Sequence, residues 1–171
     1  MLKKHNLNGY KRKTKSWKFF RAKKSNELWQ LDIKGPFTVQ GKKYWCIICI
    51  DDYSRYVLLA EQLDHCPKTE EICTLLEPLI QRYKPKSILT DNNPFKEGCR
   101  NNGIKPLHAH PYYPQDKGKV ERTIRNFVEE FILLIRKFPE WLMGKIKEFQ
   151  EWFNKERFHQ GIKAIPYQLF T

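Results

Sequence analysis

The chain has 171 residues, of which 40% are hydrophobic and 14% aromatic, which is enough apolar surface for one well-buried domain. Its formal net charge is +13, and it contains no run of about 18 or more apolar residues that could span a bilayer. These features argue against a secreted or membrane protein, and we expect a soluble intracellular protein, cytoplasmic or associated with a nucleoid.

The positive charge is concentrated at the N-terminus. No acidic residue precedes Glu27, whereas lysine and arginine recur throughout residues 1–26 among scattered aromatic residues. Such a segment commonly binds polyanions, so a nucleic-acid-binding arm is favoured over a solvated tail. We therefore divide the chain into a basic N-terminal arm (1–26), a core (27–156) and a C-terminal tail (157–171).

Extended chain is predicted at the start of the core. The runs Leu28–Val39, Lys43–Ile50 and Arg55–Leu63 are rich in aromatic and β-branched residues, with turn-forming residues between them. They predict three strands joined by hairpins, an antiparallel meander. Asp51 and Asp52 fall in the second turn, which favours a turn role over metal binding.

The cysteines are predicted to be packing thiols. Cys46 and Cys49 are three residues apart in one predicted strand, so their side chains face opposite sides of the sheet. This placement argues against a shared metal ion or a redox pair, although the spacing alone would allow either.

Helical periodicity begins at Pro67–Tyr83, where Thr69 is a plausible N-cap. Two short strands are then predicted at Lys86–Thr90 and Ile104–His108, with a brief helix at Pro94–Asn102 between them.

The last third of the chain is predicted to be mainly helical. A loop at Ala109–Lys117 leads into a helix from Gly118 to Lys137, and a second long helix follows Pro139. The fold class is therefore α/β: a mixed five-stranded sheet, with three antiparallel strands and then two parallel ones, flanked by helices.

Three acidic residues are candidate metal ligands, and one of them, Asp91, is expected at a strand end, where such sheets collect ligands. Asp32 and Asp91 each end an apolar run, and Glu121 follows in the first turns of a helix, so together they could bind divalent metal. Each also has a plainer interpretation. Asp32 could face solvent, Asp91 could cap a short helix, and Glu121 could form surface ion pairs with Lys117 and Arg125.

Four motifs around these residues resemble, in order, the catalytic core of retroviral-type integrases and the related insertion-sequence transposases. The resemblance spans about residues 26–168. The motifs are Glu27-Leu-Trp-Gln-Leu-Asp32, Ile50-Asp-Asp-Tyr-Ser-Arg55, Leu89-Thr-Asp91-Asn and Tyr112-Tyr-Pro-Gln-Asp-Lys-Gly-Lys-Val-Glu121-Arg.

This resemblance implies a ribonuclease H-like fold with a D-D-E metal triad formed by Asp32, Asp91 and Glu121. It implies two Mg²⁺ or Mn²⁺ ions as cofactors, without a nucleotide cofactor. It also implies DNA 3′-end cleavage and strand transfer, the reactions of DNA integration and transposition, by a homo-oligomer acting on element ends and target DNA.

Basic and polar residues around Glu121 are expected to contact the DNA substrate. Phosphate contacts are predicted for Lys117, Lys119, Arg122 and Arg125, although surface solvation alone would also explain these charges. Tyr113 and Gln115 are candidates for contacts with bases or with the target strand.

Two alternative functions stay open, and the spacing of the triad bears on the first of them. Only 29 residues separate Asp91 from Glu121, fewer than is common in the family, which suggests trimming around Lys96–Asn101. The chain could therefore be a catalytically inactive DNA-binding remnant. It could also be a ribonuclease H-like nuclease that cuts without strand transfer.

Overall fold

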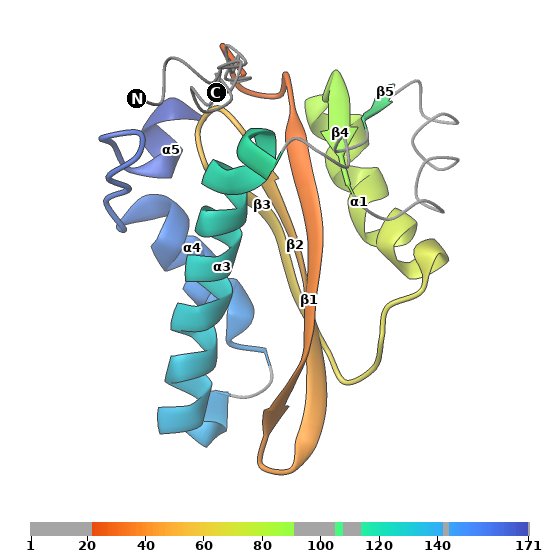
Figure 1. The fold of residues 1–171 in the computed structure, drawn as a ribbon, viewed down its shortest axis with the longest axis vertical. Helices are drawn as coiled ribbons and strands as arrows, with labels where there is room; N and C mark the ends of the chain where they lie inside the picture. The colour runs from red at the N-terminus through yellow and green to blue at the C-terminus, as the bar shows by residue number, and fades with distance from the viewer. Residues whose placement is uncertain (1–21, 91–104, 108–113, 142–143, 171) are drawn as a thin grey trace, which may run out of the picture.

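The protein is described by a computed structural model over residues 22–90, 105–107, 114–141 and 144–170, with side chains described for 22–90, 121–140 and 144–170. A sheet runs through the middle of the molecule, with α1 on one side and α3 and α4 on the other (Figure 1). Among the described helices, none is both long and apolar enough to cross a membrane.

The sheet has five strands in the order β3-β2-β1-β4-β5. β1 pairs antiparallel with β2, and β2 with β3, whereas β4 pairs parallel with β1 and with β5. The predicted mixed sheet is therefore confirmed. The strands are β1 (Trp29–Val39), β2 (Lys42–Asp51), β3 (Val57–Leu63), β4 (Ser87–Leu89) and β5 (Lys105–Leu107).

Alternation along β2 creates two hydrophobic cores, one on each face of the sheet. Cys46 and Ile48 point into the core beneath α3 and α4, whereas Ile47 and Cys49 point into the core beneath α1. The two thiols therefore lie on opposite faces, as predicted. Burial, aided by the nearby Glu61 carboxylate, raises the pKa of the Cys46 thiol to about 12, so this thiol stays protonated and serves packing.

The helix α1 (Thr69–Tyr83) covers one face of the sheet through Ile72, Leu76 and Ile80. The residue before its first turn is Lys68, which makes no side-chain capping bond, so the prediction of Thr69 as the N-cap is wrong by one position. Glu70 and Glu71 lie in the first turn, where carboxylates interact favourably with the helix dipole.

The helix α3 (Pro114–Lys137) begins earlier than predicted, because part of the expected loop Ala109–Lys117 is helical. Proline suits a first helical position, since its fixed φ angle is helical and its missing N–H would be unpaired there in any case. Gly118 therefore lies inside the helix and not at its first position. Residues 109–113 of the predicted loop, like the predicted helix Pro94–Asn102, lie outside the described residues.

The predicted second long helix is broken into shorter pieces. A single 3-10 turn, η2 (Pro139–Trp141), is followed by Gly144 with a φ of 83°, and α4 (Ile146–Lys155) begins only after it. A positive φ is incompatible with a continuous helix and costs least at glycine. The apolar stripe of α4 is nevertheless as predicted, since Ile146, Phe149 and Phe153 are buried against α3 and the sheet.

The segment after α4 lies against the core. A β-bridge joins His159 to Ala164, and Pro166 begins the short helix α5 (Pro166–Leu169). Phe170 then stacks on Tyr56 with ring centroids 4.2 Å apart. The division into arm, core and tail stays a prediction.

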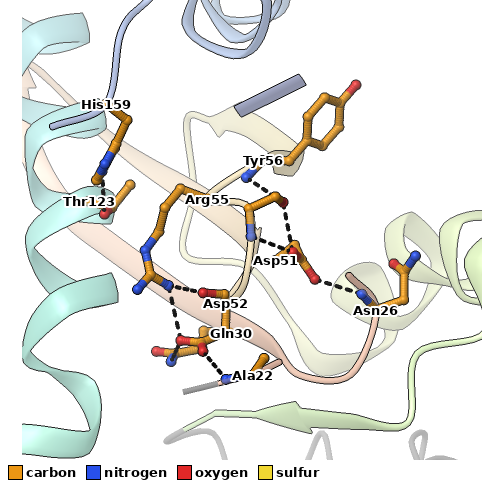
Figure 2. A network of polar contacts seen from close by, with 10 residues as sticks. Ala22, Asn26, Gln30, Asp51, Asp52, Arg55, Tyr56, Thr123 and His159 are labelled. Carbon is orange, nitrogen blue, oxygen red and sulfur yellow. Dashed lines mark hydrogen bonds and ion pairs between the residues drawn. The ribbon is translucent and has the colours of Figure 1, made fainter. Parts of the chain in front are cut away.

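Two buried carboxylates, Asp51 at the end of β2 and Asp52 in the turn that follows, are shown in Figure 2. Asp51 accepts hydrogen bonds from the backbone N–H of Asn26 (2.8 Å) and from the backbone N–H and hydroxyl of Ser54 (2.8 and 2.7 Å). Burial raises the pKa of the Asp51 carboxyl, and the hydrogen bonds from Ser54 and Asn26 oppose that effect. The first carboxylate thus ties the segment before β1 to the turn.

The second carboxylate, Asp52, connects three parts of the chain. Its Oδ2 accepts a hydrogen bond from the backbone N–H of Ala22 (2.9 Å), and its Oδ1 accepts one from Gln30 Nε2 (3.0 Å). The Arg55 guanidinium donates to the same Oδ1 at 3.1 Å and also to the backbone oxygen of Asp52. The predicted turn role of Asp51 and Asp52 therefore agrees with these contacts.

Replacing Phe127 by alanine tests the core beneath α3. This ring is fully buried and lies 4.9 Å from the Phe149 ring and 5.1 Å from the Phe153 ring. We expect the free energy of unfolding, measured by urea denaturation, to fall by about 3–5 kcal/mol. As a control, Phe158, which is 59% exposed, should lose no more than about 0.5 kcal/mol on the same substitution. Equal losses at the two sites would contradict the described packing.

Replacing Asp52 by alanine tests the buried network. The substitution leaves the Arg55 charge buried without its carboxylate, and we expect a loss of about 3–5 kcal/mol in the free energy of unfolding. Glu151→Ala is the control, because it removes an exposed ion pair with Lys155 and should cost about 0.5 kcal/mol or less. A small loss for Asp52→Ala would show that the network does not hold the turn.

Candidate active site

A pocket lies where β1, the end of β4 and the first turns of α3 meet. Two of the three predicted acids, Asp32 and Glu121, line it together although they are far apart in sequence. The pocket is lined by Gln30, Leu31, Asp32, Leu89, Thr90, Glu121 and Ile124.

The strand β1 presents Asp32 on the face that α3 covers. Trp29 and Leu31 belong to the core beneath α1, so the alternating Gln30 and Asp32 face the opposite side of the sheet. The Asp32 side chain is half-buried, and its Oδ1 accepts a hydrogen bond from the backbone N–H of Ile33 at 2.9 Å. One wall of the pocket is thus fixed by the register of the central strand.

The Asp32 carboxylate also forms an ion pair with Lys34. The Lys34 Nζ atom lies 2.6 Å from Asp32 Oδ2, and the two side chains are 40% and 29% exposed. Two residues apart on one strand, they point to the same face. The Lys34 ammonium therefore pairs with one of the two oxygens of the Asp32 carboxylate.

The helix α3 brings Glu121 to the pocket because of how its apolar side is packed. Ile124, Phe127 and Val128 are buried against the sheet, whereas Glu121 is exposed at the rim. The rotation of α3 about its axis thus decides where the glutamate lies.

Asp91 lies outside the described residues, so the triad as a whole stays a prediction. Its neighbour in sequence, Thr90, is buried and lines the pocket together with Leu89. Within the part of the chain with described placement, no group of three or more His, Cys, Asp or Glu side chains could hold a metal ion. What the described residues bring together is the pair Asp32 and Glu121.

The predicted DNA contacts are described only in part. Arg122 and Arg125 are exposed on α3, and Arg125 Nε lies 3.9 Å from Glu129 Oε1, a distance at which the guanidinium stays available to a phosphate. For Lys117, Lys119 and Gln115 only the helical backbone is described, and Tyr113 lies outside the described residues. These contacts also stay predictions.

Two residues with contacts on β1 and α3 were not singled out by the sequence. Gln30 lines the pocket and donates its amide to Asp52, so it joins the pocket to the buried network. Gln30 lies two residues before Asp32 on one strand, so the sequence already indicates that both side chains face the same side of the sheet. His159 shares a hydrogen bond of 3.1 Å with Thr123 of α3, and only the tertiary structure reveals that contact.

Comparison with known proteins gives this arrangement a family. An integrase core domain model matches residues 22–114, and a second integrase core domain model matches residues 102–166. The Gag-Pro-Pol polyprotein of squirrel monkey retrovirus is 33% identical over 110 residues, covering 59% of this chain and 6% of the polyprotein. The Pol-related polyprotein of mouse intracisternal A-particle MIA14 is 30% identical over 122 residues, covering 68% of this chain and 14% of that protein. The chain thus spans a small part of these relatives.

Solved integrases share the fold. The HTLV-2 integrase catalytic core domain in complex with magnesium (trimeric form) superimposes with a TM-score of 0.69 and 22% identity, covering 88% of this chain and all of that one. A chain of the simian T-cell lymphotropic virus intasome, in complex with PP2A regulatory subunit B56 gamma, gives a TM-score of 0.75 and 22% identity over 89% of this chain and 56% of that one. Since the first family model alone covers more than half of the residues, the chain belongs to the integrase core domain family.

Proposed function

We propose that this chain is the catalytic core of a polynucleotidyl transferase that cleaves DNA 3′ ends and transfers them to target DNA with divalent metal ions. The observation that carries the proposal is the convergence of Asp32 from β1 and Glu121 from α3 on one pocket. Membership of the integrase core domain family supports the same reaction class.

The residues of the pocket suit a hard divalent cation. Mg²⁺ prefers oxygen ligands and takes one or two carboxylates together with water and substrate phosphate, and Asp32 and Glu121 supply such carboxylates. The Lys34 ammonium on Asp32 shows that this carboxylate already attracts positive charge. The HTLV-2 integrase core, which shares the fold, was solved with magnesium.

In this proposal Asp32, Asp91 and Glu121 would hold the metal ions. Bound ions of this kind lower the pKa of an attacking water or 3′-hydroxyl and stabilise the leaving oxygen. The protein's own part is positioning. Leu89, Thr90 and Ile124 form the walls of the pocket, and the exposed Arg122 and Arg125 lie one and four residues beyond Glu121, where they could hold the DNA backbone.

DNA is the proposed partner, and a homo-oligomer is the proposed working form. The simian T-cell lymphotropic virus neighbour belongs to an intasome, and the HTLV-2 core was described in dimeric and trimeric forms. The basic residues 1–26 would add a sequence-independent contact with phosphates, because neutralising phosphate charge releases bound counterions.

Removing the carboxylates one at a time tests the proposal. We expect Asp32→Asn, Asp91→Asn and Glu121→Gln each to lower Mg²⁺-dependent cleavage and strand transfer by more than about 100-fold, since even residues that only support metal ligands are worth about 10–100-fold. DNA affinity should stay nearly unchanged, because every lysine and arginine that could bind phosphates is kept. Cleavage and joining are measured on labelled duplexes, with pre-cut ends for the joining step.

The matched control is Asp64→Asn, which neutralises a carboxylate that is 75% exposed and does not line the pocket. Full activity in the Asp32 and Glu121 variants would refute the proposed site. Salt-sensitive DNA binding by the unaltered protein without any cleavage would identify an inactive DNA-binding remnant. Cleavage of RNA–DNA hybrids without joining would identify a nuclease.

Replacing Lys34 by methionine tests the electrostatics of the site without measuring catalysis. The ammonium competes with metal for Asp32, and exposed ion pairs are worth about 0.2–1 kcal/mol, so its removal should tighten Mn²⁺ binding by about 1.4- to 5-fold. Free Mn²⁺ is measured by electron paramagnetic resonance. Lys147→Met is the control, because Lys147 forms a similar 2.7 Å ion pair with Glu61 away from the pocket. Unchanged or weaker binding by Lys34→Met would show that Lys34 does not compete.

A further inference from the structure

The segment 157–164 contacts α3 at two points on one side of the helix. Arg157 donates from Nε (3.0 Å) and from Nη2 to the two carboxylate oxygens of Glu130, and His159 Nε2 shares a hydrogen bond of 3.1 Å with Thr123 Oγ1. Figure 2 shows the His159 ring meeting Thr123 on α3. Residues seven apart lie two turns along the same side of a helix, so both contacts are made with one side of α3.

The local structure of this segment serves to present the histidine. The backbone N–H of His159 donates to the Ala164 oxygen at 2.9 Å, and the N–H of Ile162 donates back to the His159 oxygen at 3.2 Å. A Cβ atom at Gly161 would come within 3.1 Å of His159 Cε1, which is closer than side chains normally approach. Glycine at 161 therefore lets the turn fold closely against the imidazole.

The surroundings of His159 favour a neutral ring. Burial is the main cause that lowers its pKa, and the Arg55 and Arg157 guanidinium groups lower it further. Its Nδ1 atom is buried and has no hydrogen-bond partner among the described residues. The bond to Thr123 is thus the one side-chain hydrogen bond that the described residues offer this ring.

Apolar packing alone would leave the rotation of α3 loosely defined. Ile124 and Phe127 hold the helix to the sheet, but burial of apolar surface is non-directional, whereas a hydrogen bond is directional. With side chains a helix is about 10–12 Å across, so a rotation of about 10° moves a carboxylate at its surface by roughly 1 Å. A displacement of about 1 Å in a catalytic group costs about 100-fold in rate.

We propose that His159, supported by Arg157, is a positioning residue that sets the rotation of α3 and thereby the place of Glu121 in the pocket. The inference rests on the proposed function, because the place of Glu121 matters to the rate only if that carboxylate serves catalysis. The same histidine lies near Arg55, whose partner Asp52 holds Gln30 on the opposite wall. The C-terminal segment and the buried network thus support the two walls of one site.

Five variants of the full chain test the inference: four single substitutions and the double variant His159→Leu/Thr123→Val. His159→Leu and Thr123→Val each remove the hydrogen bond with little change in shape. His159→Gln can keep it, because the terminal amide of glutamine reaches about as far as Nε2 of histidine. His65→Leu is the control, since His65 is an exposed histidine that contacts Asp64 and Glu71 away from α3.

We expect His159→Leu and Thr123→Val to lower kcat for strand transfer by about 10- to 100-fold, with KM for DNA unchanged. The double variant should lose no more than either single one, because both remove the same bond. His159→Gln should recover most of the rate, and His65→Leu should behave like the unaltered protein. A kcat in His159→Leu equal to that of the unaltered protein, or no recovery in His159→Gln, would overturn the inference.

Amide hydrogen exchange supplies a readout that does not depend on activity. In His159→Leu and Thr123→Val we expect faster exchange at residues 121–128 of α3 and unchanged exchange in α1 (Thr69–Tyr83). If the unaltered protein processes no DNA, the proposed function fails, and exchange alone then decides whether His159 holds α3. Unchanged exchange in α3, or equal acceleration in α1, would show that it does not.

Discussion

The buried pair of Asp52 and Arg55 is the interaction on which the rest of the arrangement depends. One carboxylate binds the backbone of the segment before β1, the Gln30 side chain of β1 and the guanidinium that follows the β2–β3 turn. Buried charges are tolerated only when they are paired and fully hydrogen-bonded, and this carboxylate meets that condition. The central strand that carries Asp32 is therefore held by directional contacts at its start as well as by its neighbours β2 and β4.

The candidate site follows from the way one sheet face is covered. β1 turns Gln30 and Asp32 toward α3, and the apolar stripe of α3 leaves Glu121 at the rim of the same pocket. Local sequence does not bring the two carboxylates together, because Asp32 lies on β1 and Glu121 on α3. Most of the core separates these two elements in the sequence. The segment after α4 adds a second set of directional contacts through Arg157 and His159, so both walls of the pocket are supported from outside it.

Much of the fold could be predicted because its signals are local. The meander, the short parallel strands and the buried stripes of α1 and α3 follow from periods of two and of 3.6 residues, which the side-chain pattern records directly. The errors fall where local signals compete. Pro114 falls in a predicted loop, although proline also begins helices, and the apolar stripe predicts a continuous helix across Gly144, where the backbone φ is positive.

The sequence by itself determined three things: the acidic residues that are candidate ligands, the resemblance to a family, and a sheet with a hydrophobic core on each face. It could do so because these depend on residue order and on alternation along single elements. Only the tertiary structure decided that Asp32 and Glu121 share a pocket, that Asp52 contacts Gln30, and that His159 contacts Thr123. Those are contacts between distant segments, and their geometry is set by how α3, the β2–β3 turn and the segment after α4 meet the sheet and one another, which no local pattern encodes.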